Sequence, residues 1–277
     1  MQSLVRSARE VYRHDGPLSV FKWGLKWGAW RIGLNNVYQQ FVSDHLVLPL
    51  DDLSVSFASS GASVFYDFTD DFESEKDIVS EVLDAVEGGD VFYDIGANIG
   101  LYACFVGTAS DDIDVVAFEP SHRASSELRK NIELNRLDVQ IRSEALSDEC
   151  GTASFVDEGL TQNHLQSRAE TGTADATEVP IVTGDSLVDD GETPHPTVAK
   201  IDVEGAEMQV LQGLDAELSR PEFRTVFCEV HPRKLPEYDS SPEEVEQFLR
   251  ERGFSLETLY ERRSQYYLKA VKDDHEE

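Results

Sequence analysis

An acidic residue and two glycines lie around the end of one apolar segment, and a second acidic residue ends the next. The first segment, residues 91–95, contains Asp94 and leads into Gly96 and Gly100, and Glu119 follows 19 residues after Gly100. Glycine lets a backbone turn tightly and approach a ligand, and an acid at the end of a second strand usually binds a ribose diol. This spacing predicts a nucleotide-like ligand at the carboxyl edge of a sheet.

The charge of that ligand follows from the same segment. A dinucleotide fingerprint has the pattern GxGxxG, and its third glycine is missing here. Asp94, two residues before Gly96, suits a cationic group better than a pyrophosphate. S-adenosylmethionine carries an ammonium and a sulfonium and no phosphate, so it is the expected cofactor. A nicotinamide-dependent oxidoreductase on a similar sheet is the alternative.

Two further pairs of polar residues end later apolar segments. Asp202 and Glu204 follow one segment, and Glu229 and His231 end the next. Residues two apart on a strand point the same way, so each pair predicts neighbouring side chains. Asp202 or His231 is the expected base for a hydroxyl proton, while Glu204 either assists or only caps a turn. No compact ligand spacing is present, so we expect no metal; metal assistance through these four residues is the alternative.

Alternating strand and helix patterns position these residues. The expected strands are 91–95, 115–119, 139–142, 198–203, 225–230, 254–259 and 266–271, and the expected helices are 99–107, 123–135, 207–214 and 242–252. Such alternation predicts an α/β fold with a mostly parallel seven-stranded sheet and helices on both faces. Before the first strand of this sheet we expect a hairpin of residues 53–57 and 63–68, followed by a helix capped by Ser74. The polar residues 157–178 predict a long loop.

Several motifs in order resemble those of FkbM-type methyltransferases. They are residues 94–100, 118–120, 144–148, 151–155, 200–207 and 210–213, of which the Lys-Ile-Asp-Val-Glu-Gly stretch is the most distinctive. The resemblance covers about residues 60–265. It implies a Rossmann-like class I methyltransferase fold and S-adenosylmethionine-dependent O-methylation of a sugar, glycan or related small molecule.

The resemblance also implies roles for single residues. Those expected around the methionine part of the cofactor are Asp94, Gly96, Asn98 and Gly100. Glu119 would bind the ribose hydroxyls, and a turn at Ala145 and Leu146 would flank adenine. Besides its expected role as a base, Asp202 is also expected to bind the cofactor. A non-catalytic methyltransferase-like module that binds a glycan or a partner protein is the alternative from another class.

The N-terminal segment differs from the rest in charge. Residues 1–40 carry a net charge of +4 against −34 for the remainder, and they include Trp23, Trp27 and Trp30 at helical spacing. We therefore expect a basic amphipathic helical arm over residues 1–50, before a methyltransferase domain over 51–277. Its apolar face either docks on the domain, which we expect, or contacts a membrane surface peripherally.

Composition bounds the remaining possibilities. A formal charge of −30 repels phosphate backbones, so we expect no nucleic-acid partner, and it predicts a surface adapted to molar salt. Three scattered cysteines favour a reducing compartment, and no run is apolar enough to span a membrane, so a cytoplasmic location is expected. The sequence leaves the acceptor and the oligomeric state open.

Overall fold

The structure is a computed structural model that describes residues 45–58, 62–156, 164–165, 176–261 and 264–272. The chain divides into two compact units, Met1–Leu48 with Ser56–Glu73 and Pro49–Val55 with Ser74–Glu277. All candidate site residues belong to the second unit. Residues 1–44 of the predicted arm, with its three tryptophans, lie outside the described residues and stay a prediction, whereas residues 45–50 form a strand and not the predicted helix. Within the described part, no helix is long and apolar enough to cross a membrane.

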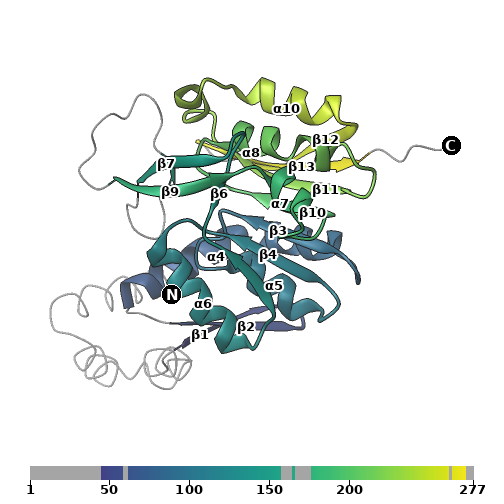
Figure 1. The fold of residues 1–277 in the computed structure, drawn as a ribbon. Coiled ribbons are helices and arrows are strands. Elements are labelled where there is room, and N and C mark those ends of the chain that lie inside the picture. The colour runs from purple at the N-terminus through teal and green to yellow at the C-terminus, as the bar shows by residue number, and fades with distance from the viewer. Residues whose placement is uncertain (1–44, 59–61, 157–163, 166–175, 262–263, 273–277) are drawn as a thin grey trace, which may run out of the picture. The chain divides into compact units, whose positions relative to one another are not determined.

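A seven-stranded sheet forms the centre of the second unit (Figure 1). Its strand order is β12-β13-β11-β10-β3-β4-β5, and only β13 runs antiparallel to its neighbours. The strands are β3 (Val91–Ile95), β4 (Asp114–Phe118), β5 (Val139–Arg142), β10 (Val198–Ile201), β11 (Thr225–Val230), β12 (Phe254–Glu261) and β13 (Tyr266–Lys272). All seven predicted strands and the mostly parallel sheet are confirmed. Every residue of β10 and β11 is buried, which explains why both sequences are mostly apolar.

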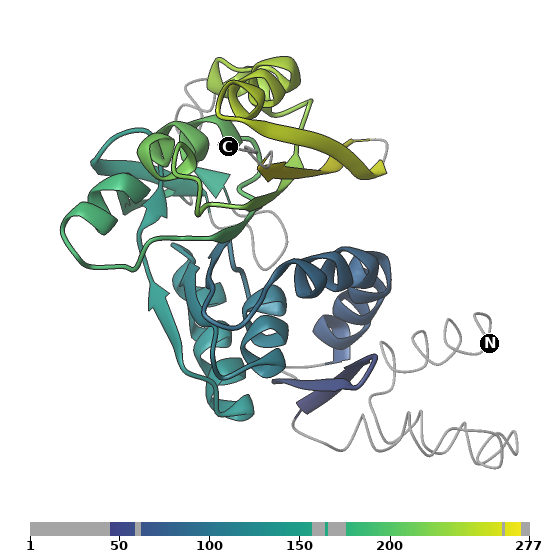
Figure 2. The ribbon, with the colours of Figure 1, turned by 90° about the vertical axis from the view of Figure 1, so that its right-hand side faces the viewer.

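Helices cover both faces of this sheet (Figures 1 and 2). Tyr93 and Ile95 of β3 pack with buried residues of helices on one side, including Val210 and Leu249. Because side chains alternate along a strand, Asp94 points to the opposite side, toward α5. The helices of this unit, apart from α4, are α5 (Leu101–Ala109), α6 (His122–Asn135), α7 (Gly184–Asp189), α8 (Glu207–Gly213), α9 (Asp215–Leu218), the 3₁₀ helix η2 (Leu235–Tyr238) and α10 (Pro242–Glu251).

The segment before the first sheet strand differs from the prediction. The hairpin is formed by β1 (His45–Leu50) and β2 (Leu53–Ala58), and residues 63–68 lie inside the helix α4 (Ala62–Ala85). The predicted pairing and the cap at Ser74 are therefore wrong. Residues 63–68 are rich in strand-favouring side chains, but such propensity is weak and context overrides it. Phe68, Phe72 and the residues from Ile78 onward continue one helical spacing through Ser74.

A second, four-stranded sheet was not predicted. Its strands are β6 (Ala145–Leu146), β7 (Gly151–Val156), β8 (His164–Leu165) and β9 (Ala176–Val182), in the order β6-β9-β7-β8. The predicted loop 157–178 is wrong at both β8 and the start of β9, and its residues 157–163 and 166–175 lie outside the described residues. These strands are short and partly polar, and β7 pairs with a strand over twenty residues later, so local pattern carries little of their signal.

Candidate active site

The carboxylate of Asp94 lies inside the protein, beneath the turn that follows β3. Its side chain is fully buried, and Oδ2 accepts a hydrogen bond of 2.9 Å from the Ala103 N–H of α5. Oδ1 has no hydrogen-bond partner among the described residues and lies 3.8 Å from Lys200 Nζ. Burial raises the pKa of Asp94, and the Lys200 ammonium opposes that rise. Asp94 thus places a negative charge below the turn.

The turn itself is packed too closely for side chains at its glycines. Gly96 has φ +77°, and a Cβ there would overlap the backbone carbonyl oxygen of Asp202. The Gly96 and Ala97 N–H groups both donate to the Phe118 carbonyl oxygen, at 3.1 and 3.0 Å. Gly100, with φ +88°, caps α5 at a point where a Cβ would overlap Leu128. The turn is therefore wedged between the ends of β4 and β10.

We expect Gly96→Ala to lower the free energy of unfolding by at least about 3 kcal/mol, because the Asp202 carbonyl group that the added methyl group would overlap belongs to the backbone and cannot simply move away. Gly191→Ala is the matched control. Gly191 also has a positive φ, +70°, but a Cβ there meets nothing within 4 Å. It should cost only about 1 kcal/mol of backbone strain. Urea unfolding of both variants measures the difference, and equal losses would contradict the packing explanation.

Glu119 connects the end of β4 to this turn. The carboxylate accepts the Asn98 N–H at 2.7 Å through Oε2 and the Ser121 N–H at 2.8 Å through Oε1. Asn98 itself has φ +51°. Burial raises the pKa of Glu119 to about 7, although the two N–H donors and Lys200 oppose the rise. Glu119 is therefore an acid that changes charge near neutral pH, beside the predicted ligand turn.

Ala145 and Leu146 are strand residues, so the predicted turn there is wrong. They form β6 and pair in parallel with Ile181 and Val182 of β9, and both are buried. The pairing partners lie 36 residues along the chain, which is why the local sequence did not reveal it. The chain leaves β6 through Ser147, whose N–H donates to the Val182 carbonyl at 2.9 Å. A contact between these residues and adenine stays a prediction.

The structure brings Asp202, Glu229 and His231 together at the ends of β10 and β11. One nitrogen or oxygen ligand atom from each lies within 4.8 Å of the others. Lys200 Nζ donates to Asp202 Oδ2 at 3.3 Å and to the Gly96 carbonyl oxygen at 3.3 Å. Burial raises the pKa of Asp202, but the positive charges of Lys200 and His231 outweigh burial and lower it overall.

His231 lies between two carboxylates. Its Nδ1 is 2.6 Å from Glu207 Oε1, and its Nε2 is 3.4 Å from Glu204 Oε2. Burial lowers the pKa of His231, but the hydrogen bond to Glu207 and the nearby negative charges raise it overall to about 9. Glu229 also ends β11, where it accepts a hydrogen bond from Gln265, and burial raises its pKa to about 8.

Glu204 lies near this cluster, but a turn positions it there and not a strand. β10 ends at Ile201, and Glu204 has φ +57° in the turn before α8, so strand alternation does not extend to it. Its Oε2 accepts a hydrogen bond of 2.7 Å from Lys234 Nζ. The prediction that Asp202 and Glu204 share a strand face is therefore wrong, although both side chains lie near His231.

Sequence reasoning gave no role to Lys200 and Glu207. Lys200 is a lysine inside an otherwise apolar strand, and such a residue needs buried partners. The sequence alone therefore indicates that Lys200 has buried partners, but it does not show which residues they are. Glu207 is an acid in the first turn of a helix, a position where acids are common without any function. Only the fold shows that it contacts His231.

Comparisons with known proteins identify a family for this chain. Residues 94–256 match the family model of the methyltransferase FkbM domain. The hexuronic acid methyltransferase AglP of Haloferax volcanii is 32% identical over 187 residues, which cover 68% of this chain and 72% of AglP. The 31-O-demethyl-FK506 methyltransferase FkbM of Streptomyces tacrolimicus is 28% identical, over 61% of this chain and 74% of that protein.

Among solved structures, a putative methyltransferase from Streptococcus mutans in complex with SAH aligns with a TM-score of 0.46 and 12% identity, over 71% of this chain and 96% of that chain. The family match alone spans more than half of the sequence, and it includes both the turn after β3 and the cluster at the ends of β10 and β11. The chain therefore belongs to the FkbM methyltransferase family.

Proposed function

We propose that this methyltransferase uses S-adenosylmethionine to methylate a hydroxyl group of a sugar acid or a related glycan. One observation carries the proposal: the turn after β3 and the acid–histidine cluster meet, because Gly96 packs against the backbone of Asp202 and both accept hydrogen bonds from Lys200. A cofactor at the turn would therefore lie beside the cluster. The 32% identity to a hexuronic acid methyltransferase supports the acceptor class.

The residues around the turn fit the expected cofactor. Bound S-adenosylmethionine would supply an electrophilic methyl group on a sulfonium. Asp94 provides buried negative charge for a cationic ligand, and its Oδ1 has no hydrogen-bond donor among the described residues. Glu119 provides a carboxylate for ribose hydroxyls, and Gly96, Asn98 and Gly100 would leave backbone close to the ligand. Ala145 and Leu146 would flank adenine.

The cluster would act on the acceptor. Asp202 is its most accessible member, with 27% of its side chain exposed, so it can contact a hydroxyl group and accept the proton. His231 is the second candidate base, since Glu207 fixes its ring and directs Nε2 into the cluster. With its pKa raised to about 9, the ring would first have to lose its own proton to the medium. Glu204 would hold His231 in place through the 3.4 Å contact.

The test has two arms. Calorimetry with S-adenosylhomocysteine and with NAD distinguishes a methyltransferase from the nicotinamide-dependent alternative, and only S-adenosylhomocysteine should bind. Transfer of a labelled methyl group is then measured to a hexuronic acid glycoside and to the matched neutral hexose. Turnover on the uronate supports the acceptor class; cofactor binding without turnover on any sugar would favour a non-catalytic binding module.

Affinity for S-adenosylhomocysteine should rise with pH through about 7, because Glu119 accepts ribose hydroxyls best when ionised. We expect roughly tenfold weaker binding at about pH 5.5 than at about pH 8.5. The same group affects stability. The pKa of Glu119 in the folded protein exceeds the ordinary value of 4.5, so Glu119 contributes most to the free energy of unfolding below pH 4.5. This contribution is lost as the pH rises through about 7. Glu119→Gln should bind weakly at every pH. Calorimetry on both proteins measures the affinity for S-adenosylhomocysteine at each pH. If the affinity of the variant depends on pH as steeply as that of the wild type, a group other than Glu119 is responsible.

A further inference from the structure

We propose that Asp202, Glu229 and His231 bind one divalent metal ion at the ends of β10 and β11. Each residue offers one ligand atom, and these atoms lie within 4.8 Å of one another. Glu229 and His231 are buried, whereas isolated acidic groups that lack a ligand are usually exposed. Two carboxylates and one imidazole are ligands shared by Mn²⁺, Fe²⁺ and Zn²⁺. Three protein ligands leave coordination positions open, as in catalytic metal sites.

The orientation of His231 is the second observation. Its Nδ1 lies 2.6 Å from Glu207 Oε1, and Glu207 is fully buried. Metal-binding histidines almost always donate the N–H of the other ring nitrogen to such a carboxylate, which fixes the ring and makes the ligating nitrogen more basic. Glu207 is fixed in turn, because the same oxygen accepts the Gly205 N–H at 2.9 Å. Nε2 is therefore the nitrogen presented to the cluster.

A buried hydroxyl group lies beside the cluster. Tyr267 of β13 pairs in register with Glu229, so both side chains lie on the same face of the sheet. The tyrosine is 1% exposed, and its hydrogen bond to Glu229 opposes the rise that burial causes in the pKa of that carboxyl. Tyr267 would therefore hold Glu229 in place as a ligand.

The surrounding charges are compatible with a cation. Lys200 donates to Oδ2 of Asp202, and Asp202 also shares a hydrogen bond with Glu229, whose proton a metal ion would replace. The Lys234 ammonium group donates to Glu204. Four carboxyl groups, those of Asp202, Glu204, Glu207 and Glu229, surround these two ammonium groups. With Glu229 ionised and His231 neutral, which metal binding requires, a divalent ion does not meet a net positive site. A metal ion there would bind acceptor oxygens and lower the pKa of a hydroxyl, a consequence that rests on the proposed function.

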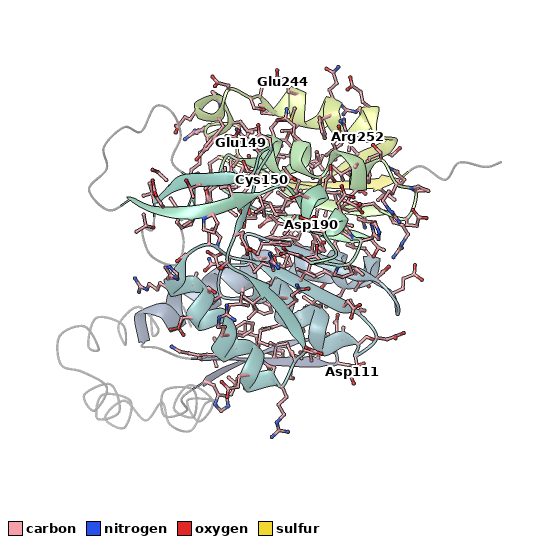
Figure 3. The ribbon with its side chains drawn as sticks, viewed as in Figure 1. Asp111, Glu149, Cys150, Asp190, Glu244 and Arg252 are labelled. Atoms are coloured by element: carbon pink, nitrogen blue, oxygen red, sulfur yellow. The ribbon has the colours of Figure 1, made fainter. Side chains whose placement is uncertain are left out.

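Mn²⁺ is the probe, because electron paramagnetic resonance detects the free ion and loses its signal when the ion binds. The full chain is stripped with a chelator and titrated in molar KCl, which screens the acidic surface. We expect one Mn²⁺ per chain. Affinity should fall at least tenfold in Glu229→Gln and by about 10- to 100-fold in Glu207→Gln. Asp111→Asn, an exposed acid labelled in Figure 3, is the matched control and should bind like the wild type.

Circular dichroism melts establish that each variant is folded. The proposal is overturned if the wild-type chain retains no Mn²⁺ in molar KCl, or if folded Glu229→Gln and Asp111→Asn bind equally, since the acidic surface then accounts for binding. Because this titration contains neither cofactor nor acceptor, its result is independent of methyl transfer. Site-specific Mn²⁺ binding without turnover would reject the proposed function and retain the metal site.

Discussion

Asp202→Asn is expected to lower kcat for methyl transfer by about 10²- to 10⁴-fold, the usual contribution of a positioned base. Asparagine has nearly the same size, so it can keep the contact with Lys200 while losing the negative charge and the capacity to take a proton. The Asp202 carbonyl oxygen that packs against Gly96 belongs to the backbone and stays in place. We therefore expect a folded enzyme that binds cofactor normally and turns over slowly.

Steady-state kinetics with the uronate acceptor, together with calorimetry for S-adenosylhomocysteine, measure the two quantities separately. Asp111→Asn removes an exposed acid of the same type and should leave kcat unchanged. The proposed metal site predicts the same loss, because Asp202 is then a ligand, and the Mn²⁺ titration distinguishes the two roles. If kcat in Asp202→Asn equals that of the wild type, proton removal is assigned to His231 instead.

Lys200→Met should lower the free energy of unfolding by about 3–5 kcal/mol, the cost of removing one partner from a buried ion pair. Lys200 is only 3% exposed, and its ammonium group faces Asp94 at 3.8 Å and Asp202 at 3.3 Å. Asp94 is fully buried, so its carboxylate would have no compensating positive charge in the variant. Methionine fills a similar volume, which confines the effect largely to charge.

A second variant separates charge from packing. Asp94→Asn combined with Lys200→Met removes both charges of the pair, and we expect it to be more stable than Lys200→Met alone. Lys130→Met is the surface control: Lys130 pairs with Glu127 at 2.8 Å but is exposed, so its loss should change stability by less than about 1 kcal/mol. Urea unfolding compares all three. Equal losses for Lys130 and Lys200 would show that the buried charges are not coupled.

The sequence predicted those parts of the fold whose signal is local. β4, β10 and β11 are largely buried, so each appears as a mostly apolar segment with distinct ends. The positions of Glu119, after β4, and of Asp202, after β10, followed from those ends. The helix α4 was misread because its first residues have the side chains of a strand, and β7 and β9 were missed because the strands stabilise each other across a long separation.

Side-chain partners were the harder part of the site. Asp94 was expected at the ligand surface, and its position in the sequence was informative, but its burial depends on Lys200, more than a hundred residues away. The pairing of His231 with Glu207 likewise joins a strand end to a helix start. Neither contact has a periodicity or a spacing that a single sequence displays.

The depth of Lys200 has a consequence for an organism whose internal salt concentration varies. At about 1 M salt, charges in water are screened beyond roughly 3 Å, so exposed pairs such as Arg250 with Glu246 lose most of their attraction. The pair of Lys200 with Asp94, whose side chains are 4% and 0% exposed, excludes solvent ions and keeps its attraction. This charge pair inside the protein is thereby insulated from the medium, and the outer surface is free to vary in charge without altering it.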